Sequence, residues 1–219
     1  MSKTACFLAL PVAALFVSLV FAGSKDAFPD PVVDQTKAAE HGKETAVLAG
    51  GCFWGVEAVF DHLNGVTDVV SGFSGGEKST AHYETVSMGR TGHAESVKIT
   101  YDPSQITYGE LLKVYFAVAH DPTEMNRQGP DTGTQYRSAI FYANEEQKKI
   151  AEAYIKQLDT AKVFSQSIAT QLVPLKGFYA AESYHQKYLQ NHPNQPYIVY
   201  NDLPKLAALK KQYPAMCRR

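Results

Sequence analysis

The sequence predicts an α+β fold, an α/β two-layer sandwich in which flanking helices cover a mixed sheet. Short apolar runs typical of strands alternate along the chain with stretches that have apolar residues at helical spacing. Several of the connections are short, which favours antiparallel neighbours within the sheet. The 219 residues are 45% hydrophobic, enough for one sizeable core.

The elements are justified in chain order by their periodicity. An apolar run at 45–49 predicts a buried strand, and apolar residues at helical spacing from Phe53 to Leu63 predict a helix that ends near Asn64. We expect further strands at 66–73, 96–101, 137–142 and 167–172, a helical turn within 81–89, and helices at 111–119, 145–158, 179–189 and 203–213. Within the predicted class, we expect these elements to form a ferredoxin-like core.

The N-terminal residues 1–23 are typical of an export signal or, if uncut, of a membrane anchor. Lys3 gives a positive start, the stretch from Ala5 to Ala22 is almost wholly apolar, and small residues favour cleavage after Ala22, with Ser24 as the runner-up. We therefore expect an exported protein, periplasmic or secreted, in which Cys6 plays no part. Residues 24–44 follow as a leader segment, either mobile or laid on the surface.

Charge and residue spacing narrow the classes of partner. The formal net charge of -1 gives no reason to expect nucleic acid or an anionic surface as the main partner. No close pair of Cys and His residues has the spacing of metal ligands, so we expect no metal and no bound cofactor. We also expect a monomer.

The main candidate for chemistry is Cys52, which lies at the corner between the first strand and the first helix, in the stretch Gly50-Gly51-Cys52-Phe53-Trp54-Gly55. The glycines permit a sharp turn and leave the sulfur accessible. Unpaired N–H groups and the helix dipole favour a thiolate there, and the thiolate is the nucleophilic form of cysteine. The alternative is a small buried apolar residue, as most free cysteines are.

Glu95 precedes the strand at 96–101, and two further candidates, Asp131 and Tyr136, come from a polar, glycine-rich loop and its end. At the rim of an apolar site the pKa of Glu95 would be raised, and the carboxyl group could donate a proton near neutral pH. The alternative is an exposed carboxylate, which is the commoner state of glutamate. A polar loop often carries functional side chains, but more often it only connects two elements.

Four motifs in order resemble the A-type peptide methionine sulfoxide reductases. They are Gly51-Cys52-Phe53-Trp54-Gly55, Gly92-His93-Ala94-Glu95, His120-Asp121-Pro122-Thr123 and Asp131-Thr132-Gly133-Thr134-Gln135-Tyr136-Arg137-Ser138. The match runs from about Thr45 to His192 and includes Ala181-Glu182-Ser183-Tyr184-His185-Gln186 near its end. Residues 45–200 are therefore the expected catalytic domain.

The resemblance implies a role for each candidate. Cys52 would attack the sulfur of methionine sulfoxide, Glu95 would protonate the oxygen, and the hydroxyls of Tyr83 and Tyr136 would bind that oxygen. Asp131 would orient the substrate or the polar network, while Phe53 and Trp54 would bind the methyl group. The resemblance also implies substrates of the S epimer, in proteins, in peptides and as free methionine sulfoxide. Reduction would leave a sulfenic acid on Cys52.

The tail departs from the pattern of many relatives, which carry two cysteines in a glycine-rich C-terminal segment. Residues 201–219 predict a tail helix with Cys217 alone. Cys217 either resolves the sulfenic acid, if the end of the chain is flexible, or is dispensable while an external dithiol reduces Cys52 directly. In both cases the resemblance implies a thioredoxin-like electron donor.

Two other functions compete with the reductase. His185 could pair with Cys52 as in a cysteine hydrolase or acyltransferase, although no hydrolase motif surrounds Cys52. A redox sensor would need only a reversibly oxidised Cys52 and would have no use for a proton donor such as Glu95. For His93 and His120 we expect structural hydrogen bonds.

Overall fold

The computed structural model of the protein describes residues 28–218, so the predicted signal or anchor at 1–23 lies outside the described residues. Its centre is a six-stranded sheet with the order β7-β6-β1-β3-β2-β8. The strands are β1 (Glu44–Gly50), β2 (Val66–Ser74), β3 (Ala94–Tyr101), β6 (Ser138–Tyr142), β7 (Gln171–Pro174) and β8 (Phe178–Ala180). Neighbours are antiparallel except β6 and β7, which are parallel, so the mixed sheet is confirmed.

Two interleaved β-α-β units form the core of this sheet. In the first, α1 (Phe53–Asp61) joins β1 to β2, and β3 lies between these two strands. In the second, α3 (Tyr108–Val114) leads from β3 toward β6, and β1 lies between these two strands. The resulting order β6-β1-β3-β2 is that of the expected ferredoxin-like core, and β8 and β7 extend it at its edges.

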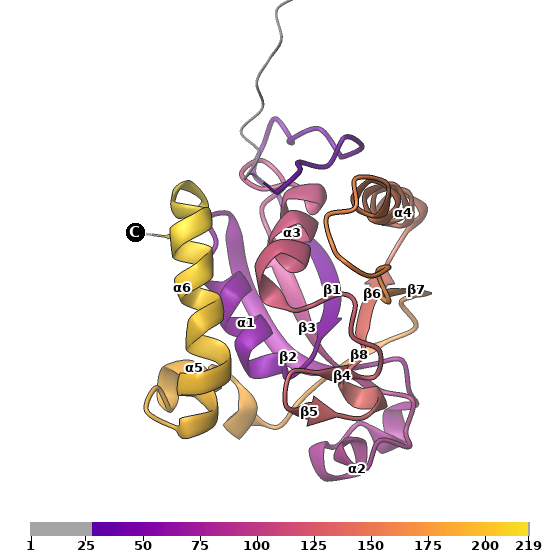
Figure 1. The fold of residues 1–219 in the computed structure, drawn as a ribbon, viewed down its shortest axis with the longest axis vertical. Coiled ribbons are helices and arrows are strands. Elements are labelled where there is room, and N and C mark those ends of the chain that lie inside the picture. Colours follow the sequence, from indigo (N-terminus) through magenta and orange to yellow (C-terminus); the bar gives the residue numbers. More distant parts are fainter. Residues whose placement is uncertain (1–27, 219) are drawn as a thin grey trace, which may run out of the picture.

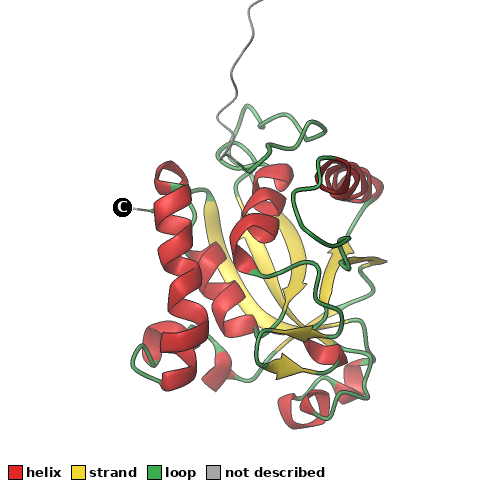
Figure 2. Ribbon diagram, viewed as in Figure 1, coloured by secondary structure: helices red, strands yellow, loops and turns green. Residues whose placement is uncertain are grey.

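Helices cover one face of the sheet, which confirms the two-layer architecture. Figures 1 and 2 show α1, α3 and α6 in front of the strands. α6 spans Leu203–Gln212, and the remaining helices are α2 (Tyr83–Ser87), α4 (Glu145–Thr160) and α5 (Tyr188–Asn191). Successive residues of β1 point to opposite faces: Ala46 and Leu48 belong to the main core with the helices, whereas Val47 and Ala49 belong to a smaller cluster.

Local sequence explains where two of the helices begin. The hydroxyl of Thr107 accepts the amide of Glu110, whose side chain accepts the amide of Thr107 in return, so a capping box starts α3. The side chain of Asn144 accepts the amide of Gln147 at the start of α4. A π-helical turn, Tyr115–Ala119, continues α3 to the predicted end, whereas α1 ends at Asp61, earlier than expected.

The prediction of one helix over 179–189 is wrong. β8 lies there instead, because Tyr179 pairs with Phe73 of β2, and a 3₁₀ turn, Ser183–His185, separates β8 from the short helix α5. The strand expected at 167–172 is shifted, because Gln171 to Pro174 pair with β6. The loop after α3 carries a small hairpin of β4 (Arg127–Gln128) and β5 (Asp131–Thr132).

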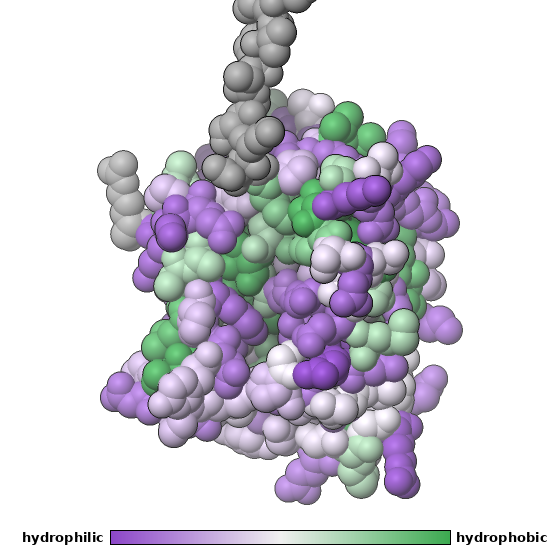
Figure 3. All heavy atoms as spheres, in the orientation of Figure 1, coloured by the Kyte–Doolittle hydropathy of each residue, from purple (hydrophilic) through white to green (hydrophobic). Residues whose placement is uncertain are grey.

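The described part of the leader, residues 28–44, is fastened to the helices. Asp34 accepts the amide of Gly109 (2.8 Å) and the hydroxyl of Thr107, and the hydroxyl of Tyr154 donates to the carbonyl of Pro29 (2.6 Å). Figure 3 shows hydrophilic side chains over most of the face drawn in Figure 1, with hydrophobic side chains in several smaller patches. Among the helices of residues 28–218, none combines the length and hydrophobicity of a transmembrane span.

Candidate functional site

The topology brings the candidate residues to one edge of the sheet. β3 and β6 both run antiparallel to β1, so their first residues lie beside the end of β1. Gly50 pairs with Ser138, and Glu95 pairs with Phe73 near the end of β2. Gly51 then turns the chain with φ +89°, and a Cβ there would lie 2.5 Å from Gln128 Cγ, so glycine is required twice over. Cys52 follows at the start of α1.

A cavity of about 230 Å³ opens at this edge. Seven of its lining residues are the predicted ones: Cys52, Phe53, Trp54, Tyr83, Glu95, Asp131 and Tyr136. Two more, Gln195 and Tyr197, were missed by the sequence analysis. Of the predicted site residues, only Cys217 lies elsewhere.

Cys52 is the residue before α1, and its side chain is 7% exposed. Burial raises the pKa of the thiol well above its usual value, and the carboxyl groups of Glu95 and Asp202 raise it further when they are ionised. The amide of Trp54 acts in the opposite direction, as expected at a helix N-terminus, but it is outweighed. The predicted effect of the helix start on Cys52 is therefore present, but burial outweighs it and the thiol keeps its proton at neutral pH.

Glu95 is also buried, with 2% of its surface exposed. Its Oε2 accepts the amide of Phe53 (3.1 Å), so the carboxyl group caps α1 from a neighbouring strand. Burial raises the pKa of Glu95 to about 8, despite that hydrogen bond. The group is mostly protonated at pH 7 and can act as a general acid. Of the two alternatives, the structure shows the buried carboxyl.

Aromatic rings form one wall of the cavity. The ring of Phe53 stacks with that of Tyr83 (centroids 6.4 Å apart, 26°) and lies 5.2 Å from the ring of His185. Trp54 stacks on Tyr188 at 3.8 Å and 9°, and its indole N–H donates to His185 Nδ1 (3.2 Å). This wall is apolar enough to receive a methyl group and keeps water from the carboxyl group of Glu95.

His185 is engaged by Trp54 rather than by Cys52. Because Nδ1 accepts a hydrogen bond, the ring proton is on Nε2, and burial lowers the pKa of the imidazole. A neutral His185 bound to tryptophan does not form the ion pair that a papain-like hydrolase needs. His93 and His120 make the structural bonds expected of them, to Glu77 O (3.0 Å) and Tyr115 O (3.1 Å) respectively.

The chain is similar to known methionine sulfoxide reductases. A family model described as "Peptide methionine sulfoxide reductase" matches residues 44–216. A Mesorhizobium japonicum protein named "Peptide methionine sulfoxide reductase MsrA 2" is 61% identical over 178 residues, 81% of this chain and 91% of that protein. A Synechocystis protein of the same name is 54% identical over 84% of this chain and 87% of its own length.

Solved structures agree with the sequence relatives. Mxr1 from Saccharomyces cerevisiae in reduced form has a TM-score of 0.63 and 35% identity, over 75% of this chain and 92% of that one. Methionine sulfoxide reductase A of Corynebacterium diphtheriae has a TM-score of 0.61 and 38% identity, over 78% and 84% of the two chains. The chain belongs to the A-type peptide methionine sulfoxide reductases.

In this member of the family, the segment before α6 adds residues to the site that periodicity did not reveal. The hydroxyl of Tyr197 donates to Asp131, and Gln195 lines the cavity beside it. The sequence signal for this part of the site was weak. It was an aromatic residue, Tyr197, in the Pro-containing stretch 193–202, which predicted no regular element.

An ion pair between the buried Asp202 and the partly buried Lys205 lies beside the first turn of α1. Asp202 is fully buried, its Oδ1 lies 3.3 Å from Lys205 Nζ, and its Oδ2 has no hydrogen-bond partner among residues 28–218. The pair rests against the first turn of α1, since a Cβ at Gly55 would lie 2.1 Å from Asp202 Oδ1. The two charges act in opposite directions on the pKa of Cys52, Asp202 raising it and Lys205 lowering it.

Cys217 lies at the other end of α1. It pairs with Leu63 in an isolated β-bridge, and the amide of Arg218 donates to the carbonyl of His62 (2.8 Å). Cys52 precedes α1 and Leu63 follows it, and a helix of 9 residues spans roughly 13 Å at about 1.5 Å per residue. A disulfide needs Cα atoms within about 7 Å of each other, so the two thiols are too far apart to bond in this arrangement. Both cysteines are free.

Proposed function

We propose that this chain reduces methionine S-sulfoxide in peptides and proteins, and free methionine sulfoxide, with Cys52 as the nucleophile and Glu95 as the acid. One observation carries the proposal: a buried thiol and a buried, protonated carboxyl group line the same aromatic cavity. A hydrolase would instead need a base beside the thiol, and a redox sensor would need no acid at all.

The raised pKa values of both groups fit one proton route. At neutral pH both Cys52 and Glu95 hold a proton. When Glu95 gives its proton to the sulfoxide oxygen, its carboxylate becomes a base that takes the proton of the Cys52 thiol. The net result is that one proton moves from the thiol to the sulfoxide oxygen. The sulfur of Cys52 bonds to the sulfoxide sulfur. The oxygen, now a hydroxyl, then moves from that sulfur to the sulfur of Cys52, so that the S–O bond and the new S–S bond both break and an electron pair returns to the methionine sulfur. Methionine sulfur gains two electrons, and Cys52 becomes a sulfenic acid.

The remaining lining residues serve recognition. The rings of Phe53 and Trp54 receive the methyl group, and the hydroxyls of Tyr83 and Tyr136 donate to the oxygen as negative charge develops on it. Asp131 keeps the hydroxyl of Tyr197 at the rim of the cavity. These assignments follow from the lining of the cavity and from the chemistry of a polar S–O group beside an apolar methyl group.

An external dithiol of the thioredoxin kind regenerates Cys52 under this proposal. The distance between the two ends of α1 supports this route over Cys217. One thiol condenses with the sulfenic acid, releasing water and forming a mixed disulfide, and a second thiol displaces Cys52 as the free thiol. The apolar stretch from Ala5 to Ala22 supports an exported enzyme, so the donor works in the same compartment. Cell fractionation with an antibody tests the location.

The test of the function is steady-state reduction of paired peptides that differ only in the epimer of one methionine sulfoxide, with dithiothreitol as the reductant. We expect turnover of the S epimer alone and none with Cys52→Ser. Turnover by Cys52→Ser, or equal turnover of both epimers by the parent, would refute the assignment. The exposed Glu152→Gln on α4 is a matched surface control.

A further inference from the structure

A left-handed turn at Lys187 lies behind the aromatic wall. Lys187 has φ 52° and ψ 33°, a conformation that residues with a side chain rarely adopt. The turn is placed between two residues that contact Trp54: His185, which accepts the indole N–H, and Tyr188, which stacks on the indole face. The left-handed residue thus stands between the residue that meets the edge of the indole ring and the residue that meets its face.

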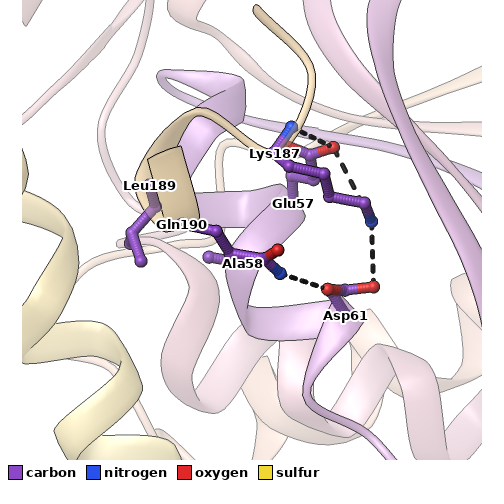
Figure 4. Close-up of a pocket in the computed structure, with 6 residues that line it drawn as sticks. All are labelled: Glu57, Ala58, Asp61, Lys187, Leu189 and Gln190. Carbon is purple, nitrogen blue, oxygen red and sulfur yellow. Dashed lines mark hydrogen bonds and ion pairs between the residues drawn. The ribbon is translucent and has the colours of Figure 1, made fainter. Parts of the chain in front are cut away.

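Two acidic residues of α1 hold the turn (Figure 4). The amide of Lys187 donates to both oxygens of Glu57 (3.2 and 2.9 Å), and Lys187 Nζ lies 2.9 Å from Asp61 Oδ1. Gln190 Nε2 donates to Asp61 Oδ2 (2.7 Å). Residues three and four apart share a helix face, so Trp54, Glu57 and Asp61 present one side of α1 to residues 185–190.

Glu57 is buried, which is unusual for a glutamate that has no role beyond forming a helix. It is 2% exposed, and burial raises its pKa to about 7. The six residues drawn in Figure 4 close against one another and leave no room for a ligand. A buried carboxylate is retained only where its hydrogen bonds are needed, and its shortest bond goes to the backbone of the left-handed residue.

We infer that Glu57 is a positioning residue for substrate recognition: by holding the backbone of Lys187, it keeps His185 and Tyr188 on Trp54 and so fixes the wall that receives the methyl group. The inference rests on the proposed reductase function for its kinetic consequence. The structural part of the inference, that Glu57 immobilises Trp54, does not depend on the reaction.

Trp54 is the sole tryptophan of the chain, so its fluorescence reports on this wall directly. The experiment compares the parent with Glu57→Leu, which removes the acceptor at similar volume, and Glu57→Gln, which keeps one acceptor oxygen without the charge. Glu152→Gln is the control. Emission wavelength and acrylamide quenching are measured at pH 8, together with kcat and KM for an S-sulfoxide peptide.

For Glu57→Leu we expect red-shifted emission, stronger quenching and a KM raised about tenfold, with kcat changed by less than about twofold, because a charge-assisted bond is lost from ground-state positioning. Glu57→Gln should lie between Glu57→Leu and the parent in both readouts. Lys187→Gly adopts the turn without strain and keeps the amide, so its Trp54 signal should match that of the parent.

Parental fluorescence and KM in both Glu57 variants would overturn the inference. A fall in kcat at unchanged KM would also overturn it, because Glu57 would then act on the chemical step. If Glu57→Leu does not fold, Glu57→Gln decides alone, and a signal equal to that of the parent refutes the inference. A parent that folds but reduces no sulfoxide would refute the proposed function, while the fluorescence comparison would still test the positioning of Trp54.

Discussion

Replacing Glu95 with glutamine should make the protein more stable and nearly inactive. The glutamine would keep the shape of the side chain and an oxygen for the amide of Phe53, but it has no acidic proton to give. We expect the single-turnover rate at pH 7 to fall by about 10²–10⁴-fold, the usual contribution of a general acid. In the parent, the rate should fall as the pH rises through about 8, as Glu95 ionises.

The stability change follows from the same pKa. The pKa of Glu95 is raised from 4.5 to about 8, so between these values the unfolded chain has released a proton that the folded protein still holds. The folded parent therefore loses stability as the pH rises through this range, approaching about 5 kcal/mol at 1.36 kcal/mol per pKa unit. Glutamine does not ionise, so the variant avoids this loss.

Urea unfolding of the two proteins at pH 5 and pH 8 measures the difference. We expect similar free energies of unfolding at pH 5 and a variant that is several kcal/mol more stable at pH 8. An equal difference at both pH values would show that Glu95 does not hold its proton in the folded state. A variant with the parental rate would remove Glu95 from its role in the reaction.

Three further substitutions test other parts of the site. Lys205→Met leaves the buried Asp202 without its cation, so we expect a loss of about 3–5 kcal/mol in the free energy of unfolding. Because Lys205 lowers the pKa of Cys52, we also expect slower alkylation of Cys52 by iodoacetamide at pH 9. The exposed Lys211→Met is the control, and equal alkylation rates in Lys205→Met and the parent would refute the reasoning. Gly55→Ala places a Cβ 2.1 Å from Asp202 Oδ1 and should cost about 1–3 kcal/mol by thermal unfolding, whereas an unchanged melting temperature would argue against the close contact. Cys217→Ser should keep the parental kcat with dithiothreitol, and its inactivation would restore Cys217 as the resolving thiol.

Periodicity predicted the core of the fold because each of its elements carries its own pattern. The apolar run in β1 and the apolar spacing in α1 depend on neighbours in sequence; β1 formed where expected, and α1 began where expected but ended earlier. The prediction of one helix over 179–189 failed because the structure of this segment depends on a residue far away in the sequence. Tyr179 is held in β8 by Phe73, and no local pattern reports that pairing.

The site was predictable in its residue types but not in its electrostatics. The motifs contain six of the seven predicted lining residues, and the family resemblance added Tyr83; the strand order explains why they meet. The protonation state of Cys52 depends on burial and on the carboxyl groups of Glu95 and Asp202, set against the effect of the helix N-terminus, and this comparison needs positions in space. Tyr197 and Asp202 reach the site through contacts with other elements, so no spacing along the chain distinguishes them.

The most direct test of the account is a single turnover with no added reductant. Prereduced protein receives one equivalent of an S-sulfoxide peptide in the presence of dimedone, which traps sulfenic acids, and the cysteines are then mapped by mass spectrometry. We predict one methionine per chain, a dimedone adduct on Cys52 and a free Cys217. Failure to form methionine, or a Cys52–Cys217 disulfide in place of the adduct, would contradict the account.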